Sequence, residues 1–498
     1  MKTQSIWKAW FRNNERANLM KKTEIPFLTA TDLSHKIRNK EISPTEVVIA
    51  YIERIENIDP TLNSYITICS KHALDKAKDL EASLMQGDYK GPFHGIPVAV
   101  KDQWWTKGIR TTGGSSTLSS YIPEKDATVM EHMNKAGGIL LGKTNMTEFA
   151  MGATFDFPFG IPRNPWDIQY GVGGSSAGSG SAVAAHLTAT ALGEDTTGSI
   201  RTPSCWNGIV GLRPTWGLVS RYGMMGHCWS FDAIGPMSKT VEDCALTLQA
   251  IAGYDPKDPY TSRRPVPNYL ESIKRDISGL KIGVIQETMS NGELDPEVKS
   301  LVSNAIKDIE SLGVFVDQIS LPLIIHAGAI SAPISFTECS AIHKYNISNN
   351  LGLMDHTIEL NMLTGRLIPA QTYYKAQRLR ELWRKQALDA LKSYDILLQP
   401  TCATFAPKIG PRPSPGTRTS EKNALYGNKS LRTPWSLLGN PALSLPCGFG
   451  VQGLPTSIQV IGRHFEEETI FALGHAFEKL NAWNKYSPTD LNERGRIG

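Results

Sequence analysis

The chain has 498 residues, of which 41% are hydrophobic and 20% are charged, and its formal net charge is +4. A chain of this size and composition can bury a large core, so it should be globular rather than disordered. Its charges are spread without a block of about five or six of one sign, which gives no case for a nucleic-acid partner.

No apolar run approaches the roughly 20 residues that span a bilayer, and the N-terminus has no apolar stretch followed by a small-residue cleavage site. The seven cysteines are odd in number, widely scattered and include no C-x-x-C pair. This pattern favours reduced, mostly buried thiols and argues against a zinc site or a disulfide framework. We therefore expect a cytoplasmic protein with no transmembrane segment and no cofactor.

Residues 1–27 are basic and carry Trp7, Trp10 and Phe11 at spacings that would share one helical face before Pro26. An arm packed on its own domain or on a second copy is the simpler interpretation. A partner-binding or membrane-surface arm is the alternative. The sequence leaves a homodimer as one option for the oligomeric state.

From residue 31 to about residue 87, apolar residues recur at helical spacing. Thr31 is expected to cap the first helix, and Pro44 and Pro60 to separate the segments. We expect two or three amphipathic helices here.

Between residues 95 and 253 the composition shifts to Gly, Ser, Thr and Ala, interrupted by short apolar runs at 96–100 and 138–141. Glycine and serine at this density, with apolar runs between them, indicate backbone that approaches a ligand rather than a linker. These residues should hold the chemical centre.

The second half of the chain alternates between strand-like and helix-like segments. Strands are predicted at 278–285, 314–316, 395–398, 442–445 and 456–461, and helices at 297–312 and 373–394. The first strands and the helix between them are typical of a βαβ unit. These elements predict a single large α/β domain over residues 28–485, with a mixed, twisted central sheet covered by helices on both faces. Residues 486–498 would form a C-terminal tail.

The apolar strand at 96–100 ends in Lys101. A lysine at a strand end is usually a solvated group, but this strand is too apolar to lie at a sheet edge. Lys101 should therefore emerge at the carboxyl end of a central strand, where α/β sheets place their sites. A lysine desolvated there can lose its charge and act as a base near neutral pH.

A Gly/Ser run at 173–181 leads into a small-residue helix. Backbone N–H groups at such a helix start can face an anion or an oxyanion. The run also contains the G-x-S-x-G pattern of a nucleophile elbow at 174–178, which would make Ser176 the nucleophile of a Ser-His-Asp hydrolase.

This elbow alternative has two requirements. It needs a strand immediately before it, yet residues 162–172 hold two prolines and little strand pattern. It also needs an acid and a histidine late in the chain. His464 and His475 are available, but both lie in ordinary helix-like or strand-end sequence.

A small, flexible loop at 193–201 follows the apolar run at 189–192. Such a loop can turn several consecutive N–H groups toward one point, which is the geometry of an oxyanion hole. If the loop is considered alone, a plain turn is a simpler interpretation than a catalytic loop.

Together, the three segments resemble the amidase signature family, whose catalytic set is Ser, Ser and Lys. The family's G-G-S-S-[GA]-G-S stretch matches residues 173–179, its D-T-x-G-S-I-R stretch matches residues 195–201, and its K-D after an apolar strand matches residues 101–102. Further matches lie at 142–146, 164–166, 211–215, 235–236 and 439–446. The likeness covers roughly residues 28–480 and implies the amidase signature fold.

The resemblance also implies a mechanism. Ser199 would be the nucleophile, Ser175 the bridging hydroxyl and Lys101 the base, since a serine hydroxyl needs an adjacent base at neutral pH. The peptide bond between residues 174 and 175 would be cis, as in the family. The oxyanion-hole donors would be the N–H groups of Thr196, Thr197, Gly198 and Ser199. Supporting roles would fall to Asp195, Arg201 and Ser176.

Two residues of the 193–201 loop depart from the family pattern. The family usually has glycine at the position of Thr197 and a small or hydroxyl residue at that of Glu194, so this loop is bulkier. Bulky side chains near the motifs suggest an apolar or aromatic substrate, with simple packing as the alternative. The predicted substrate-pocket residues are Trp104, Trp105, Met151, Trp229 and Phe231.

The sequence thus predicts an amidohydrolase that cleaves the C–N bond of a small apolar or aromatic carboxamide through an acyl-enzyme. The main alternative within the family is the A subunit of the glutamine-dependent tRNA amidotransferase, which shares the string at 221–223. A carbamate, urea-derivative or ester hydrolase on the same residues is another. A catalytically dead scaffold protein is the alternative from a different class.

Overall fold

The structure is a computed structural model that describes residues 22–151, 157–410 and 428–488. Most of the predicted N-terminal arm, including Trp7, Trp10 and Phe11, therefore lies outside the described residues, as does the predicted tail from residue 489 onward. No helix in the part of the chain that is described is both long and apolar enough to cross a membrane.

The N-terminal region forms the helices expected there. They are η1 (Lys22–Phe27), α2 (Ala30–Arg38), α3 (Pro44–Leu62) and α4 (Ser70–Met85). The prediction that Thr31 caps the first helix is wrong, because the Thr29 side chain accepts the Asp32 N–H in a capping box. The Thr31 hydroxyl instead donates to Asp243 at 3.0 Å. Pro60 does not end a segment either, since it lies in the last turn of α3.

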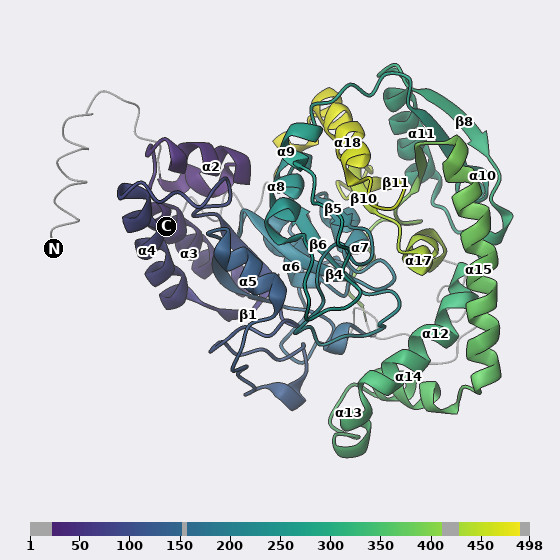
Figure 1. The fold of residues 1–498 in the computed structure, drawn as a ribbon, viewed down its shortest axis with the longest axis horizontal. Helices are drawn as coiled ribbons and strands as arrows, with labels where there is room; N and C mark the ends of the chain where they lie inside the picture. The colour runs from purple at the N-terminus through teal and green to yellow at the C-terminus, as the bar shows by residue number, and fades with distance from the viewer. Residues whose placement is uncertain (1–21, 152–156, 411–427, 489–498) are drawn as a thin grey trace.

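One sheet organises the fold (Figure 1), and eleven strands of it lie in the described residues. They are β1 (Tyr65–Ile68), β2 (Pro97–Lys101), β3 (Ile139–Thr144), β4 (Thr190–Asp195), β5 (Val210–Arg213), β6 (Ala233–Ser238), β7 (Lys281–Ile285), β8 (Phe315–Ile319), β9 (Ile396–Pro400), β10 (Ala442–Phe449) and β11 (Pro455–Gly462). Their spatial order is β1-β3-β2-β4-β6-β5-β10-β11-β9-β7-β8. The sheet contains both parallel pairs, such as β2 with β4, and antiparallel pairs, such as β4 with β6, so it is mixed, as predicted.

The pairing brings five strand ends to one edge of the sheet. β2 runs parallel to β4, with Val100 beside Leu192. β6 is antiparallel to β4, so that Ala233 at its start lies beside Asp195. β10 begins at Ala442, beside the last residue of β5. The C-terminal ends of β2, β4 and β5 therefore meet the beginnings of β6 and β10, where α/β sheets bind ligands.

The predicted βαβ unit is confirmed. β7 and β8 pair in parallel, and α11 (Pro296–Glu310) connects them. The sequence did not predict β1, because four residues between two helices give little alternation. β1 pairs antiparallel with β3 at the end of the sheet.

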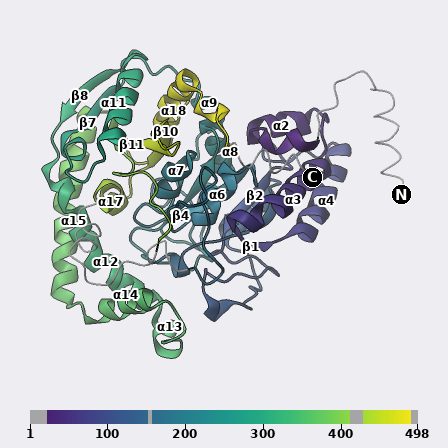
Figure 2. The ribbon, with the colours of Figure 1, turned by 180° about the vertical axis from the view of Figure 1, so that it is seen from behind.

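Helices cover both faces of the sheet (Figure 1). The remaining ones are η2 (Ser116–Leu118), α5 (Thr128–Lys135), η3 (Glu148–Ala150), α6 (Ala177–Ala184), α7 (Arg201–Asn207), α8 (Val241–Ile251), α9 (Tyr269–Ser272), α10 (Gln286–Met289), η4 (Pro322–His326), α12 (Ala327–Ile342), α13 (Lys344–Asn349), α14 (His356–Leu367), α15 (Ala370–Ser393), α17 (Asn428–Leu438), α18 (Glu467–Asn481) and η5 (Trp483–Lys485). Helices α2, α3 and α4 lie at one end of the molecule and α15 at the other, in the front view and from behind (Figure 2). Helix α12 packs against α14, α15 and α17.

Candidate active site

Lys101 is the last residue of β2, and its side chain is fully buried. It lies there because β2 has a partner strand on each side, β3 and β4. Its Nζ donates to the Ser175 Oγ at 2.7 Å and to the Glu194 Oε2 at 2.9 Å. Burial lowers the pKa of Lys101 below its usual value, and the Glu194 carboxylate acts in the opposite direction. A buried amine of lowered pKa in contact with a serine hydroxyl has the chemistry of a general base.

Ser175 precedes helix α6 and follows a cis peptide bond from Gly174, as the resemblance implied. Its neighbour Ser176 is turned away from the solvent. The Ser176 Oγ is fully buried, donates to the Glu194 carbonyl at 3.1 Å and accepts the Glu194 N–H at 3.2 Å. Ser176 therefore ties the start of α6 to the end of β4.

The arrangement needed by the nucleophile-elbow alternative is absent from the described residues. The elbow needs a strand immediately before the run at 174–178, and residues 162–172 form none. His464 makes a 2.9 Å hydrogen bond to the Leu438 carbonyl, and His475 lies on α18. Neither histidine is among the described residues that line the cavity beside Ser175.

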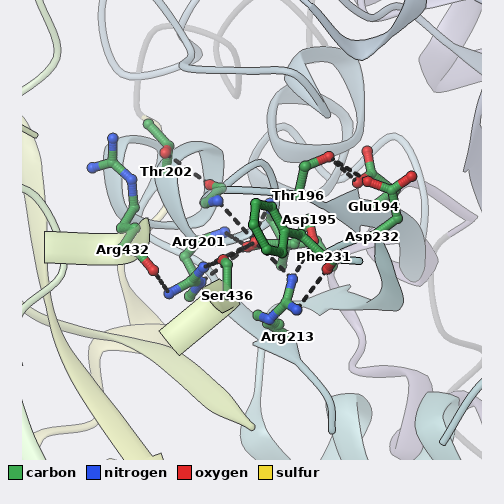
Figure 3. Close-up of polar contacts among 12 residues, drawn as sticks. Glu194, Asp195, Thr196, Arg201, Thr202, Arg213, Phe231, Asp232, Arg432 and Ser436 are labelled. Atoms are coloured by element: carbon green, nitrogen blue, oxygen red, sulfur yellow. Dashed lines mark hydrogen bonds and ion pairs between the residues drawn. The ribbon is translucent and has the colours of Figure 1, made fainter. Parts of the chain in front are cut away.

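Asp195 organises the loop that carries Ser199 (Figure 3). Its carboxylate accepts the Gly198 N–H at 2.8 Å and two guanidinium donors of Arg201 at 2.9 Å. Arg213 adds a second ion pair at 3.3 Å, and all three side chains are fully buried. Burial alone would raise the pKa of Asp195, but the Arg201 and Arg213 guanidinium groups outweigh it and hold the pKa below the usual value.

Arg201 joins this loop to the C-terminal half of the chain. Its Nη1 donates to the Arg432 carbonyl at 2.8 Å and to the Gln459 Oε1 at 2.6 Å, and its Nη2 donates to the Ser436 Oγ at 2.8 Å. Arg201 thus connects the Ser199 loop with α17 and β11. Asp195 and Arg201 thus contact each other and the loop backbone, and their predicted role in fixing that backbone stays a prediction.

A second cluster of carboxyl groups lies on the other side of the same loop (Figure 3). The Thr196 Oγ1 is 2.7 Å from the Glu194 Oε1 and 2.8 Å from the Asp232 Oδ1. Asp232 also accepts the N–H groups of His227 and Cys228. Burial, together with the Glu194 carboxylate, raises the pKa of Asp232 to about 7.

A cavity of about 440 Å³ opens beside these groups. Both serines line it, with Thr197 and Gly198 of the loop between them. The opposite wall comes from α12, with Gly328, Ser331, Ala332, Ser335 and Phe336. The rest of the described lining consists of Ala150, Met151, Gly174, Thr202, His227, Asn361 and Arg432.

The predicted aromatic substrate pocket needs correction, since Met151 lines the cavity but the four aromatic residues do not. Trp104 is fully buried. Trp105 packs edge-on against Tyr222, and Trp229 stacks on the Arg221 guanidinium at 4.3 Å. Phe231 is fully buried beneath the guanidinium of Arg380. These aromatic groups are used in packing, which was the alternative interpretation.

Three polar residues at the site were not predicted. Arg432 reaches the cavity from α17, more than 200 residues after the loop that it contacts, and Asp232 precedes β6. Glu194 was noticed only as a departure from the family pattern. Within the described ranges, no group of three or more His, Cys, Asp or Glu side chains could hold a metal ion.

The mixed α/β sheet carries a buried lysine in contact with one of two serines that line a single cavity, and the comparisons identify this arrangement as that of enzymes acting on carbon–nitrogen bonds. A family model described as Amidase matches residues 46–471, and the chain therefore belongs to the amidase family. It is 39% identical over 485 residues to the A subunit of the glutamyl-tRNA(Gln) amidotransferase of Geobacillus kaustophilus, a match that covers 92% of this chain and 98% of that protein.

Two solved structures extend the comparison. The A subunit of the glutamyl-tRNA(Gln) amidotransferase of Thermotoga maritima is 33% identical with a TM-score of 0.77, covering 91% of this chain and 95% of that one. The peptide amidase of Stenotrophomonas maltophilia is 28% identical with a TM-score of 0.79, covering 91% of this chain and 97% of that one. Both a peptide amidase and a component of an amidotransferase thus share this fold.

Proposed function

We propose that the protein cleaves a carboxamide through an acyl-enzyme, with Ser199 as the nucleophile, Ser175 as the relay and Lys101 as the base. The observation that carries this proposal is the 2.7 Å contact between the Lys101 Nζ and the Ser175 Oγ, at a cavity that Ser199 also lines. A neutral lysine that receives the Ser199 proton through Ser175 makes the serine oxygen nucleophilic.

The reaction then follows in two stages. The Ser199 Oγ bonds to the carbonyl carbon while its proton passes to Ser175 and the Ser175 proton passes to Lys101. The relay runs backwards to protonate the nitrogen as the C–N bond breaks. Water, activated by the same base, then hydrolyses the ester and releases Ser199.

The geometry reduces the set of N–H groups that can serve as oxyanion-hole donors from four to three. The Gly198 N–H already donates to the Asp195 carboxylate at 2.8 Å, so it is committed to holding the loop. We propose that the N–H groups of Thr196, Thr197 and Ser199 are left for the oxyanion. Such a donor is worth roughly 3 kcal/mol of barrier.

Arg432 supports a substrate that carries an anionic group. Among the described residues that line the cavity, Arg432 is the one that is always charged, and it is only 6% exposed. Its guanidinium donates to the Cys402 sulfur and the Thr401 carbonyl, and the described residues give it no carboxylate partner. A Cβ on Gly198 would lie 2.5 Å from the Arg432 Nε, which puts the cation directly against the nucleophile loop. The acyl group we propose is therefore a short one that ends in a carboxylate, rather than an aromatic one.

Arg432→Gln should lower kcat/KM about 10- to 100-fold on the monoamide of glutarate and leave the neutral pentanamide nearly unchanged, because one charge-assisted contact is lost. The measurement is a panel of dicarboxylate monoamides, each compared with its neutral counterpart. Arg54→Gln is the matched control, since Arg54 lies on α3, donates to the Ala185 carbonyl and does not line the cavity. An equal loss on both members of each pair would show that Arg432 only supports the loop.

A second candidate is the A subunit of a glutamyl-tRNA(Gln) amidotransferase, which the comparison at 39% identity favours over a free-standing amidase. Glutamine is itself a carboxamide with a carboxylate, so the same cavity chemistry suits it. Glutamine turnover that requires added partner subunits would favour the amidotransferase. Turnover by the isolated chain would favour the hydrolase. Comparing its rates on matched amide, ester and carbamate substrates would then show which bond it prefers to cleave.

The nucleophile assignment is tested by covalent labelling. A sulfonyl fluoride should modify Ser199, and peptide mass spectrometry should find the label there, since an activated serine in an oxyanion hole reacts selectively. Ser199→Ala should remove the label. A label on Ser176 would contradict the assignment and restore the nucleophile-elbow alternative.

A further inference from the structure

Glu194 is a fully buried carboxyl group in direct contact with the base, and the mechanism above does not use it. We propose that Glu194 is a positioning residue that holds Lys101 against Ser175 and accepts the lysine proton that must leave before Lys101 can act as a base. This inference rests on the proposed function of Ser199, Ser175 and Lys101.

The hydrogen bonds at Lys101 show why a proton has to leave. A protonated lysine has three N–H donors and no lone pair. The Nζ has three acceptors, the Ser175 Oγ at 2.7 Å, the Glu194 Oε2 at 2.9 Å and the Glu194 carbonyl at 3.4 Å. An ammonium group would satisfy all three and could accept nothing from Ser175. The Glu194 carboxylate is the charged acceptor in contact with Lys101 that can take its proton, and both side chains are fully buried.

The remaining charged groups around Lys101 are already paired. Asp195, beside Glu194 on β4, is neutralised by Arg201 and Arg213. Asp102, next to Lys101 on the chain, faces Lys143 at 3.4 Å. Of the described acidic groups, Glu194 and Asp232 are left to determine the protonation state of Lys101.

Thr196 shows that Glu194 and Asp232 share a proton. Its hydroxyl lies 2.7 Å from one carboxyl group and 2.8 Å from the other, yet it has a single proton to donate. Two ionised carboxylates would leave one oxygen facing the Thr196 oxygen without a hydrogen between them. One of the two carboxyl groups therefore carries a proton and donates it to Thr196. The pKa of Asp232, raised to about 7 by burial and by Glu194, agrees with this.

The proton balance is closed within the site. One Lys101 N–H proton moves to the Glu194 Oε2, the Ser175 proton moves to the freed Nζ, and the Ser199 proton moves to Ser175 as the Ser199 Oγ bonds to the carbonyl carbon. When the C–N bond breaks, the leaving nitrogen takes the proton from Ser175. Ser175 then recovers a proton from Lys101, and Glu194 returns its proton to Lys101. No proton enters from outside.

The test is the pH dependence of Ser199 labelling by a sulfonyl fluoride, measured between about pH 5 and 10 on the full chain. In the unmodified protein the lysine proton moves to Glu194 within the site, whereas the Glu194→Gln variant must lose it to solvent, so this variant should move the acid-side midpoint up by about one pH unit or more. A downward shift would mean that Glu194 only raises the pKa of Lys101 by its charge and takes no proton, which would overturn the inference. Glu194→Ser should shift it in the same direction, and Glu194→Asp, which keeps the charge, should stay close to the unmodified protein. Glu467→Gln is the matched control, because Glu467 is buried on α18 and accepts the Thr215 N–H away from the cavity. Its midpoint should not move.

A merely structural role for Glu194 would slow labelling by one factor at every pH and leave the midpoint in place, which would overturn the inference. Thermal melting of each variant shows whether it is folded, and Glu194→Ser replaces Glu194→Gln in the comparison if the latter is not. Failure of the proposed function looks different, since the label would then be absent from Ser199 in the unmodified protein as well. That result would overturn both.

Discussion

Lys101→Met should lower kcat for amide hydrolysis by about 10³- to 10⁴-fold, because it removes the general base and keeps the side-chain volume. The Lys101 Nζ lies 2.7 Å from the Ser175 Oγ, and burial lowers the pKa of Lys101 so that a neutral amine is accessible. Without the lysine nitrogen, the Ser175 hydroxyl has no acceptor for the proton that it receives from Ser199. The expected loss lies in kcat rather than in KM, since Lys101 does not line the cavity.

Lys143→Met is the matched control for this variant. Lys143 is also fully buried at the same edge of the sheet, but its Nζ donates to the Trp104 carbonyl and to Thr106 and Thr111. It should lower stability and leave Ser199 labelling in place. Replacement of His464 or His475 should also retain most of the activity. A Lys101→Met protein that still hydrolyses amides at more than about a tenth of the normal rate would remove lysine from the mechanism.

The position of Lys101 could be predicted from the sequence because one local feature determines it. An apolar run of five residues has to form a central strand of a sheet. A polar residue at the carboxyl end of that strand must then lie where the strand ends of α/β sheets bind ligands. The structure places Lys101 there, between β3 and β4. The large α/β sheet and the βαβ unit at 278–319 were also predictable from local sequence, because strand-like and helix-like segments alternate along the chain.

The direction of the Glu194 side chain could not be predicted in this way. Glu194 faces Lys101 only because β2 and β4 pair in parallel with Val100 beside Leu192, and register is a property of the assembled sheet. Arg432 comes from a helix far along the chain, and nothing in its local sequence marks it. The aromatic residues near the motifs gave a misleading signal, since Trp229 and Phe231 pack against arginines outside the cavity.

The capping box at the start of α2 could have been predicted from the local sequence. The sequence from Thr29 to Asp32 has a capping residue followed three positions later by an acid, which is the pattern of a capping box. Thr31 satisfies the same preference for a hydroxyl, but its side chain is used for a tertiary contact to Asp243 on α8. Propensity alone cannot separate these two threonines.

The contacts of Asp195 connect the stability of the fold to the shape of the Ser199 loop. Its carboxylate is the partner of two fully buried guanidinium groups, and it accepts the N–H of Gly198, the residue before the proposed nucleophile. Removing one partner of a buried ion pair leaves an uncompensated charge. In this site, two charges would be left at once, in Arg201 and Arg213.

Asp195→Asn should therefore lower the free energy of unfolding by at least about 3–5 kcal/mol, measured by chemical denaturation, and should also slow the labelling of Ser199. The second effect follows because the loop loses an anionic acceptor for the Gly198 N–H and the anchor of Arg201, so the oxyanion donors are no longer fixed. Asp258→Asn is the control, because Asp258 forms a buried ion pair with Arg221 at 3.4 Å outside the cavity lining. It should lower stability while the labelling rate of the folded protein stays normal. If both variants slow labelling equally at matched stability, Asp195 has no specific effect on the loop, and the slower reaction reflects only a less stable fold.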